Sequence, residues 1–145
     1  LPEGITAIGD DAFCGCKISS LTLPSSLKTI GARAFSNNGI TQLTIPNKVE
    51  SIGNAAFAHN SIDHIDFPAT LVSLHATAFK WESMNEVICR ALAVPQTPQT
   101  DEFNNSWRPF YHINEICVLK VPAESLTIYQ QAWEGYFQSV ETIQE

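Results

Sequence analysis

The first 90 residues repeat with a period of 22, and this period constrains the fold more than any other feature of the sequence. Four kinds of residue recur at that step, in the columns Pro2, Pro24, Pro46 and Pro68; Phe13, Phe35, Phe57 and Phe79; Ala12, Ala34, Ala56 and Ala78; and Ile8, Ile30, Ile52 and Leu74. One unit of this length has too few apolar side chains to enclose a core of its own, so neighbouring units must stack. The period therefore predicts a solenoid in which each unit forms one coil.

The chain divides into four regular units, one irregular unit and a tail, which we expect to form one domain. The regular units are 3–24, 25–46, 47–68 and 69–90, the irregular unit is 91–122, and the tail is 123–145. A chain of 145 residues is long enough for one domain with a real core and too short for two ordinary ones.

Each regular unit ends in a short segment that alternates polar and apolar residues and stops at proline, as in Q-L-T-I-P at 42–46. This alternation is typical of a strand with one buried face. Proline has no N–H to donate, so it ends the strand. The G-x-x-A-F piece of each unit, such as 31–35, predicts a single helical or 3₁₀ turn that directs Ala and Phe inward.

One column of each unit holds Cys16, Asn38 and Asn60. A buried Asn can bond the main chain of a tight bend together with that of the neighbouring coil, and Cys can fill the same small space. We therefore expect this column to lie inside the solenoid.

These motifs resemble the BspA-like subfamily of bacterial leucine-rich repeats, in which A-F-x-x-C/N leads into an L-x-I-P strand. The segments 34–46 and 56–68 match that pattern closely, whereas the fourth unit departs from it at Glu82 and at Cys89-Arg90. The resemblance implies an α/β repeat, a right-handed leucine-rich repeat solenoid with short parallel strands on its concave face. It also implies a bacterial cell-surface or secreted protein associated with adhesion and with binding host proteins.

The tail resembles the closing segment of the same family and predicts a helical cap on the last coil. Its apolar residues follow one another at helical spacing, at Leu126, Tyr129, Trp133, Phe137 and Val140. Pro122 and the possible N-cap Ser125 place the helix start near 124–126, and the spacing extends the helix to 140.

Residue 1 falls inside a unit, on an apolar-proline ending. This position predicts that the chain is the C-terminal portion of a longer protein. An uncovered first coil would expose Ile5, Ile8 and Leu21.

In stacked coils, the outward residues of successive strands form columns about 4.8 Å apart. One column is Ser20, Gln42, His64 and Glu86, and the next is Thr22, Thr44, Asp66 and Ile88. Repeat proteins often bind partners on this surface, so Gln42, Thr44, His64, Asp66, Glu86 and Ile88 are candidate partner-binding residues. A solvated face without a ligand is an equally open interpretation.

His64 beside Glu86, with Asp63 or Asp66 nearby, raises the alternative of a metal site. Alternate strand residues point the same way without converging on one point, so a surface ion pair is the default interpretation. We therefore expect no metal and no cofactor.

The four cysteines are predicted to be free thiols, with Cys16 and Cys89 buried. Cys14 and Cys16 are too close in sequence for an unstrained bridge. If Pro122 ends the next strand, Cys117 lies four residues short of the Cys89 column, roughly 13 Å away against a limit of about 7 Å between bridged Cα atoms.

The least repetitive segment, 91–118, is predicted to be a structured excursion. Its aromatic residues Trp107, Phe110 and Tyr111 are a second set of candidate partner-binding residues. The alternative that they fold back over the last coil is favoured about two to one by how often such insertions serve as caps. Trp81, Trp107 and Tyr111 could also serve as stacking platforms for a glycan.

Charge and motifs exclude several classes of function. With 8 basic and 15 acidic side chains the net charge is −7, which argues against nucleic acid and anionic membranes as partners. No apolar run is long enough to span a membrane. Residues 1–4 have neither the basic start nor the apolar stretch of a signal peptide. The sequence contains no G-x-S-x-G, no H-E-x-x-H and no phosphate-binding glycine loop.

We therefore predict a non-enzymatic interaction or adhesion module that binds a host extracellular protein or a neighbouring bacterial surface protein. A structural spacer that projects another domain and a glycan-binding module remain as alternatives.

Overall fold

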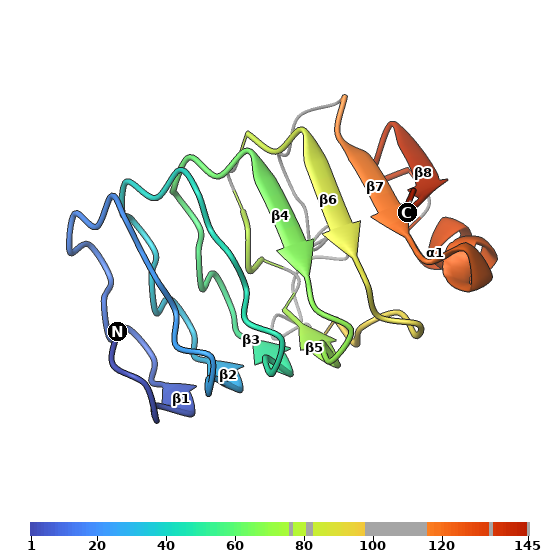
Figure 1. Ribbon diagram of the computed structural model, residues 1–145. Helices are drawn as coiled ribbons and strands as arrows, with labels where there is room; N and C mark the ends of the chain where they lie inside the picture. Colours follow the sequence, from blue (N-terminus) through green and yellow to red (C-terminus); the bar gives the residue numbers. More distant parts are fainter. Residues whose placement is uncertain (76, 81–82, 98–115, 134, 145) are drawn as a thin grey trace, which may run out of the picture.

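The chain winds into a parallel-strand solenoid of about five turns that ends in a short helix (Figure 1). This computed structural model describes residues 1–75, 77–80, 83–97, 116–133 and 135–144. The N-terminus lies at one end of the solenoid, and the helix α1 lies at the other. The solenoid predicted from the 22-residue period is thus confirmed.

Two parallel sheets run along the solenoid, on different sides of each coil (Figure 1). The short-strand sheet consists of β1 (Ala7–Ile8), β2 (Thr29–Ile30), β3 (Ser51–Ile52) and β5 (Ser73–Leu74). The long-strand sheet consists of β4 (His64–Phe67), β6 (Glu86–Cys89), β7 (Val118–Val121) and β8 (Ser139–Thr142). The sequence predicted only the second of these strand positions, because two-residue strands leave too short an alternation to recognise.

The register of the strands confirms the columns predicted from the sequence. Ile30 pairs with Ile52 in the short-strand sheet, and Ile65 pairs with Val87 in the long-strand sheet. Val87 then pairs with Leu119, so β7 stands directly before Pro122 as expected. The irregular unit therefore returns to the same sheet despite its extra length.

Stacked phenylalanine rings form the centre of the core. Phe13, Phe35, Phe57 and Phe79 follow one another with ring centroids 5.3 Å apart and nearly parallel planes. The last three rings are completely buried, as are the alanines that precede them. One ring from each coil thus continues the core along the axis of the solenoid.

The G-x-x-A-F pieces direct Ala and Phe inward as predicted, and they form tight turns with i→i+3 bonds such as Ser36 N to Arg33 O at 3.2 Å, but not a regular helix. Asp11, Arg33 and Ala55 have positive φ angles of 57°, 54° and 50°, which interrupt any helix. Alternate N–H groups bond to the next coil, as in Arg33 N to Asn54 O at 2.7 Å and Phe35 N to Ala56 O at 2.8 Å, and those between them bond within the turn. The bonds between coils require N–H groups that point across to the next coil, which a regular helix does not provide.

The asparagine column bonds adjacent coils as predicted. Asn60 Nδ2 donates to Phe57 O at 2.7 Å within its own bend and to Phe35 O at 3.0 Å in the preceding coil. Its Oδ1 accepts from Ile40 N at 3.1 Å. Asn38 repeats this arrangement one coil earlier. Cys16 in the same column is exposed, so its predicted burial is wrong, since its thiol lacks the amide donors and acceptor that hold Asn38 and Asn60 in place.

Gly9, Gly31 and Gly53 recur at the 22-residue step, and the last two mark a close approach between coils. A Cβ atom on Gly53 would lie 2.9 Å from Ala32 N, and one on Gly31 would lie 2.7 Å from Asp10 N. In the fourth coil His75 takes this position and is buried, with its Nδ1 accepting from Thr77 N at 3.3 Å. Thr77 Oγ1 in turn donates to Asn54 Oδ1 at 2.6 Å, so side chains connect the coils there.

The C-terminal cap is shorter than predicted and partly β. The 3₁₀ turn η1 (Ala123–Ser125) leads into α1 (Leu126–Ala132), so the helix starts where expected but ends eight residues before 140. Gly135, with a φ of 75°, turns the chain back so that 139–142 joins the long-strand sheet as β8. Ser125 makes no N-cap bond, because its hydroxyl donates to Leu92 O at 2.8 Å. Sheet pairing with β7 thus overrides the helical spacing of the last apolar residues.

The first coil is better covered than its sequence suggested. Ile8 is buried, with 6% of its surface exposed, whereas Ile5 and Leu21 are half-buried. The expectation that Ile8 is exposed is therefore wrong, because its side chain packs in the hydrophobic core together with Leu27 and Ile30 of the next coil.

We expect Asn60→Ala to lower the free energy of unfolding by about 2–3 kcal/mol, because it leaves one N–H and two carbonyl groups without this partner. Urea unfolding measures the effect. Ser61→Ala, at the exposed neighbouring position, is the control and should cost less than about 0.5 kcal/mol. Equal losses in the two variants would contradict the role of the asparagine column.

A methyl group on Gly53 would collide with the backbone of the preceding coil, so we expect Gly53→Ala to cost about 1–3 kcal/mol. Gly9→Ala is the matched control, because a Cβ at Gly9 meets nothing within 4 Å. Thermal melting of both variants tests the close approach, and an unchanged melting temperature for Gly53→Ala would refute it.

Candidate functional site

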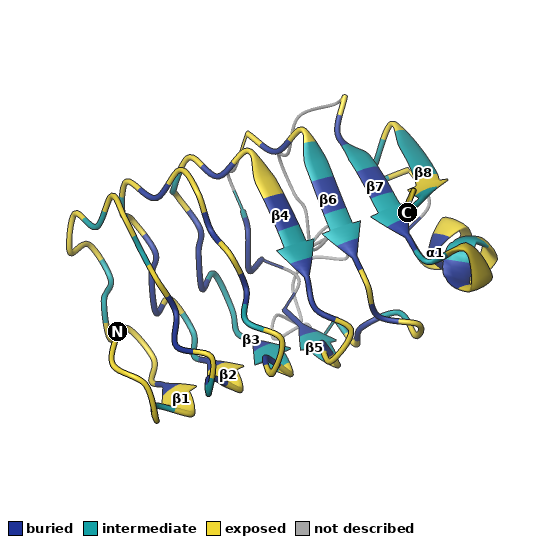
Figure 2. Ribbon diagram, in the orientation of Figure 1, coloured by how far each residue is buried: buried dark blue, intermediate teal, exposed yellow. Residues whose placement is uncertain are grey.

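The candidate site is the outward surface of the long-strand sheet and of the extended segments that continue it into the first two coils. We call this surface the strand face and define it by Ser20, Thr22, Gln42, Thr44, His64, Asp66, Glu86, Ile88, Val118 and Lys120. Figure 2 shows how these positions alternate with buried ones along β4, β6 and β7. The fold therefore brings together all six candidate residues that the columns predicted.

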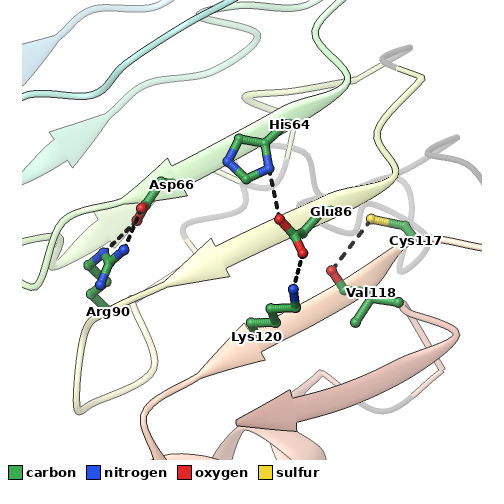
Figure 3. Close-up of polar contacts among 7 residues, drawn as sticks. All are labelled: His64, Asp66, Glu86, Arg90, Cys117, Val118 and Lys120. Carbon is green, nitrogen blue, oxygen red and sulfur yellow. Dashed lines mark hydrogen bonds and ion pairs between the residues drawn. The ribbon is translucent and has the colours of Figure 1, made fainter. Parts of the chain in front are cut away.

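Glu86 joins the two strands on either side of its own (Figure 3). Its Oε1 lies 3.0 Å from Nδ1 of His64 on β4, and its Oε2 forms an ion pair with Nζ of Lys120 on β7. The hydrogen bond and the charge of Glu86 raise the pKa of Lys120, which keeps that ammonium group charged at neutral pH. The His64–Glu86 contact is the surface side-chain pair that the sequence favoured over a metal site, and it is an ion pair only when His64 is protonated.

Asp66 forms a second pair, with Arg90 of the next coil (Figure 3). The guanidinium group donates from Nε to Oδ1 at 2.8 Å and from Nη2 to Oδ2 at 2.7 Å. This bidentate hydrogen bonding to the Asp66 carboxylate raises the pKa of Arg90. Ile88 lies between Asp66 and Lys120 in the strand register and is half-buried.

Lys120 belongs to the strand face and Arg90 lies beside it, although the columns predicted neither. Lys120 stands two residues before Pro122, the same distance that separates Thr44 from Pro46. Counting back from Pro122 would therefore have predicted that Lys120 faces outward. Arg90 occupies the proline column one coil after Asp66, which also placed it within reach. Both side chains pair with acidic residues that the columns had already identified.

These contacts leave Asp66 and Glu86 paired with basic side chains rather than convergent on one point. Exposed pairs of this kind contribute up to about 1 kcal/mol each and are screened by salt. Within the described residues, no three His, Cys, Asp or Glu side chains come together in a group that could hold a metal ion. The strand face is thus a polar surface on which Asp66 and Glu86 are paired with basic side chains.

Several candidate residues lie outside the part of the chain that the structure describes. These are Trp81, Trp107, Phe110 and Tyr111. The binding role of the excursion and the stacking of a glycan on these rings therefore stay predictions from the sequence.

All four cysteines are free thiols, as predicted, but their burial differs from the prediction. Cys89 and Cys117 are buried, Cys14 is half-buried and Cys16 is exposed. Burial, together with the charge of Glu86, raises the pKa of Cys117 to about 12. Burial also raises the pKa of Cys89, although the 3.2 Å contact with the Tyr129 hydroxyl partly opposes this shift. Both buried thiols therefore stay protonated at neutral pH and are poor nucleophiles.

The family model for the BspA type leucine rich repeat region matches residues 1–106 with six copies of the repeat. The chain belongs to the BspA-type leucine-rich repeat family. Solenoids of this family are typically bacterial surface or secreted modules, generally act as non-enzymatic scaffolds and support protein interaction. A search of curated proteins finds no match to the chain. No helix among the described residues of this BspA-type solenoid is long and apolar enough to cross a membrane.

Thiol labelling tests the assigned burial of the cysteines. With a thiol reagent at pH 8 we expect rapid reaction at Cys16, slower reaction at Cys14, and reaction at Cys89 and Cys117 only after unfolding. Mass spectrometry of peptides from the labelled protein identifies the modified residues. Rapid labelling of Cys117 in the folded protein would contradict the packing around β7.

Proposed function

We propose that this BspA-type domain is a non-enzymatic interaction module that binds a protein partner through its strand face. The observation that carries the proposal is the register of the coils, which aligns exposed polar side chains in two continuous columns. Such a surface is extended and fixed in shape, as repeat proteins that bind macromolecules require. A host extracellular protein or a neighbouring bacterial surface protein is the proposed partner, and the cell surface or the secreted fraction is the proposed location.

The core supports the proposal because it makes the strand face rigid. The residues between the outward positions are buried, among them Ile65, Phe67 and Val87. The pairs Asp66–Arg90 and Glu86–Lys120 hold four of the outward or neighbouring side chains in defined positions. A surface that is ordered before binding loses less conformational entropy when a partner arrives.

The same ion pairs favour a second candidate, a structural spacer. Charges that already neutralise one another offer little net attraction to a partner, and they would have to separate to bind one. On this interpretation the paired side chains stabilise the stack of coils, and the domain only positions another part of a longer protein. The two candidates differ in whether the strand face has a partner at all.

A capture experiment distinguishes the two candidates. The domain is immobilised and exposed to extracts of extracellular matrix and of bacterial surfaces, and any retained protein is purified and its affinity measured by surface plasmon resonance. We expect the combined variant His64→Ala, Asp66→Ala and Glu86→Ala to bind at least about tenfold more weakly, a loss of about 1.4 kcal/mol.

The matched control changes the outward residues of the opposite sheet, with Thr29→Ala, Ser51→Ala and Ser73→Ala combined. Its affinity should remain within about twofold of the unmodified domain. A partner that binds both variants equally well would show that the strand face is not the binding surface. Absence of any retained protein from either extract would favour the spacer.

A further inference from the structure

The long-strand sheet does not extend into the first two coils. β4 pairs with β6 on one side only, although 43–45 and 21–23 occupy the equivalent positions in the preceding coils. Backbone N–H and C=O groups of residues 42–45 form no hydrogen bond with any described residue. These backbone groups point toward 20–23 and 64–67 in the adjacent coils, so an incoming chain would reach the outward side chains of this segment rather than its backbone.

A cavity of about 540 Å³ opens between 21–23 and 43–45, at the carboxyl-terminal ends of these segments. Leu21 and Pro46 contribute apolar lining, and Thr22 and Thr44 contribute hydroxyl groups. A smaller cavity of about 110 Å³ shares Thr44 as a lining residue and continues toward Asp66 and Arg90 of the later coils. We call the two cavities together the coil-end groove.

Two charged residues line the groove, Glu3 and Lys48, and neither forms an ion pair with a described residue. Glu3 accepts hydrogen bonds from Ser25 N at 3.1 Å and from Ser25 Oγ at 2.9 Å, and these bonds lower its pKa, so it is ionised at neutral pH. Among the described residues neither Glu3 nor Lys48, which lines the same cavity, lies within 4.0 Å of an opposite charge. This distinguishes the groove from the rest of the strand face, where Asp66 and Glu86 are already paired.

The repeat sets the separation of these charges. Glu3 and Asn47, the residue before Lys48, occupy one column two coils apart. Two steps of the 5.3 Å ring stack correspond to roughly 11 Å, the length of three to four residues of extended chain at about 3.3 Å each.

We propose that the coil-end groove binds an extended peptide segment of a partner protein, with a basic side chain at Glu3 and an acidic side chain at Lys48. This inference rests on the proposed function and names the part of the domain that makes the contact. The peptide main chain would bond to the hydroxyl groups of Thr22 and Thr44, and its apolar side chains would pack on Leu21 and Pro46. A glycan is disfavoured because, among the described residues, no aromatic ring lines the groove for a sugar to stack on.

The test uses a library of random linear octapeptides displayed on phage and selected on the whole domain. We expect enriched peptides to carry one Lys or Arg and one Asp or Glu three or four positions apart. Synthetic copies of these peptides are then titrated calorimetrically against the domain and its variants. Selection without enrichment above background would overturn the proposal.

Thr44→Tyr fills the groove at a residue shared by both cavities and should weaken peptide binding at least about tenfold. Thr29→Tyr, an exposed position in the same coil but on the opposite sheet, is the matched control and should leave the affinity unchanged. Circular dichroism checks that both variants fold. Peptides that bind Thr44→Tyr as tightly as the unmodified domain would refute the groove.

Lys48→Glu provides a second variant at an exposed position. We expect it to weaken binding about three- to tenfold, and replacement of the acidic residue of the peptide by Lys to restore the loss. An unchanged affinity, or a loss that the altered peptide does not restore, would exclude Lys48 as a contact. If peptides fail in these tests but a captured protein still depends on His64, Asp66 and Glu86, this inference is wrong and the proposed function stands.

Discussion

Hydrogen bonds between successive coils are the interaction on which the rest of the structure depends. A coil of 22 residues is too short to satisfy its own backbone, so N–H groups at its turns donate to carbonyl groups of the next coil, as Phe35 does to Ala56. Positive φ angles at residues such as Arg33 and Ala55 orient these groups along the axis. Gly53 permits the approach, and Asn60 bonds the main chain of both coils where the chain bends. Each coil is therefore stable only as part of the stack.

The same stacking creates and limits the strand face. It brings His64, Glu86 and Lys120 into adjacent strands although they are far apart in the sequence, and it lets Asp66 reach Arg90. In the later coils, Asp66 and Glu86 are thereby neutralised by Arg90 and Lys120. The first two coils lack the ladder of the long-strand sheet and keep Glu3 and Lys48 out of ion pairs among the described residues, so the two halves of one surface differ in what they offer a partner.

Repetition explains which features were predictable. The columns of Phe35, Ala34 and Asn38 each occur several times, so their shared burial or bonding follows from the spacing of the sequence alone. Features that occur once were harder to infer. The chain after Trp133 follows helical spacing yet turns at Gly135 to form β8, whose pairing with β7 covers the backbone edge of that strand. Cys16 shares a column with Asn38 but lacks its amide, and it lies exposed.

The sequence by itself determined the solenoid, its period, its inward residues and the columns that face outward, because each of these follows from spacing along the chain. Only the tertiary structure decided which outward charges pair, where the long-strand ladder stops and where a groove opens. These features depend on distances between coils and on side-chain reach across them. Glu86 shows the difference: its column was evident from the sequence, but its simultaneous contacts with His64 and Lys120 exist only once three strands lie side by side.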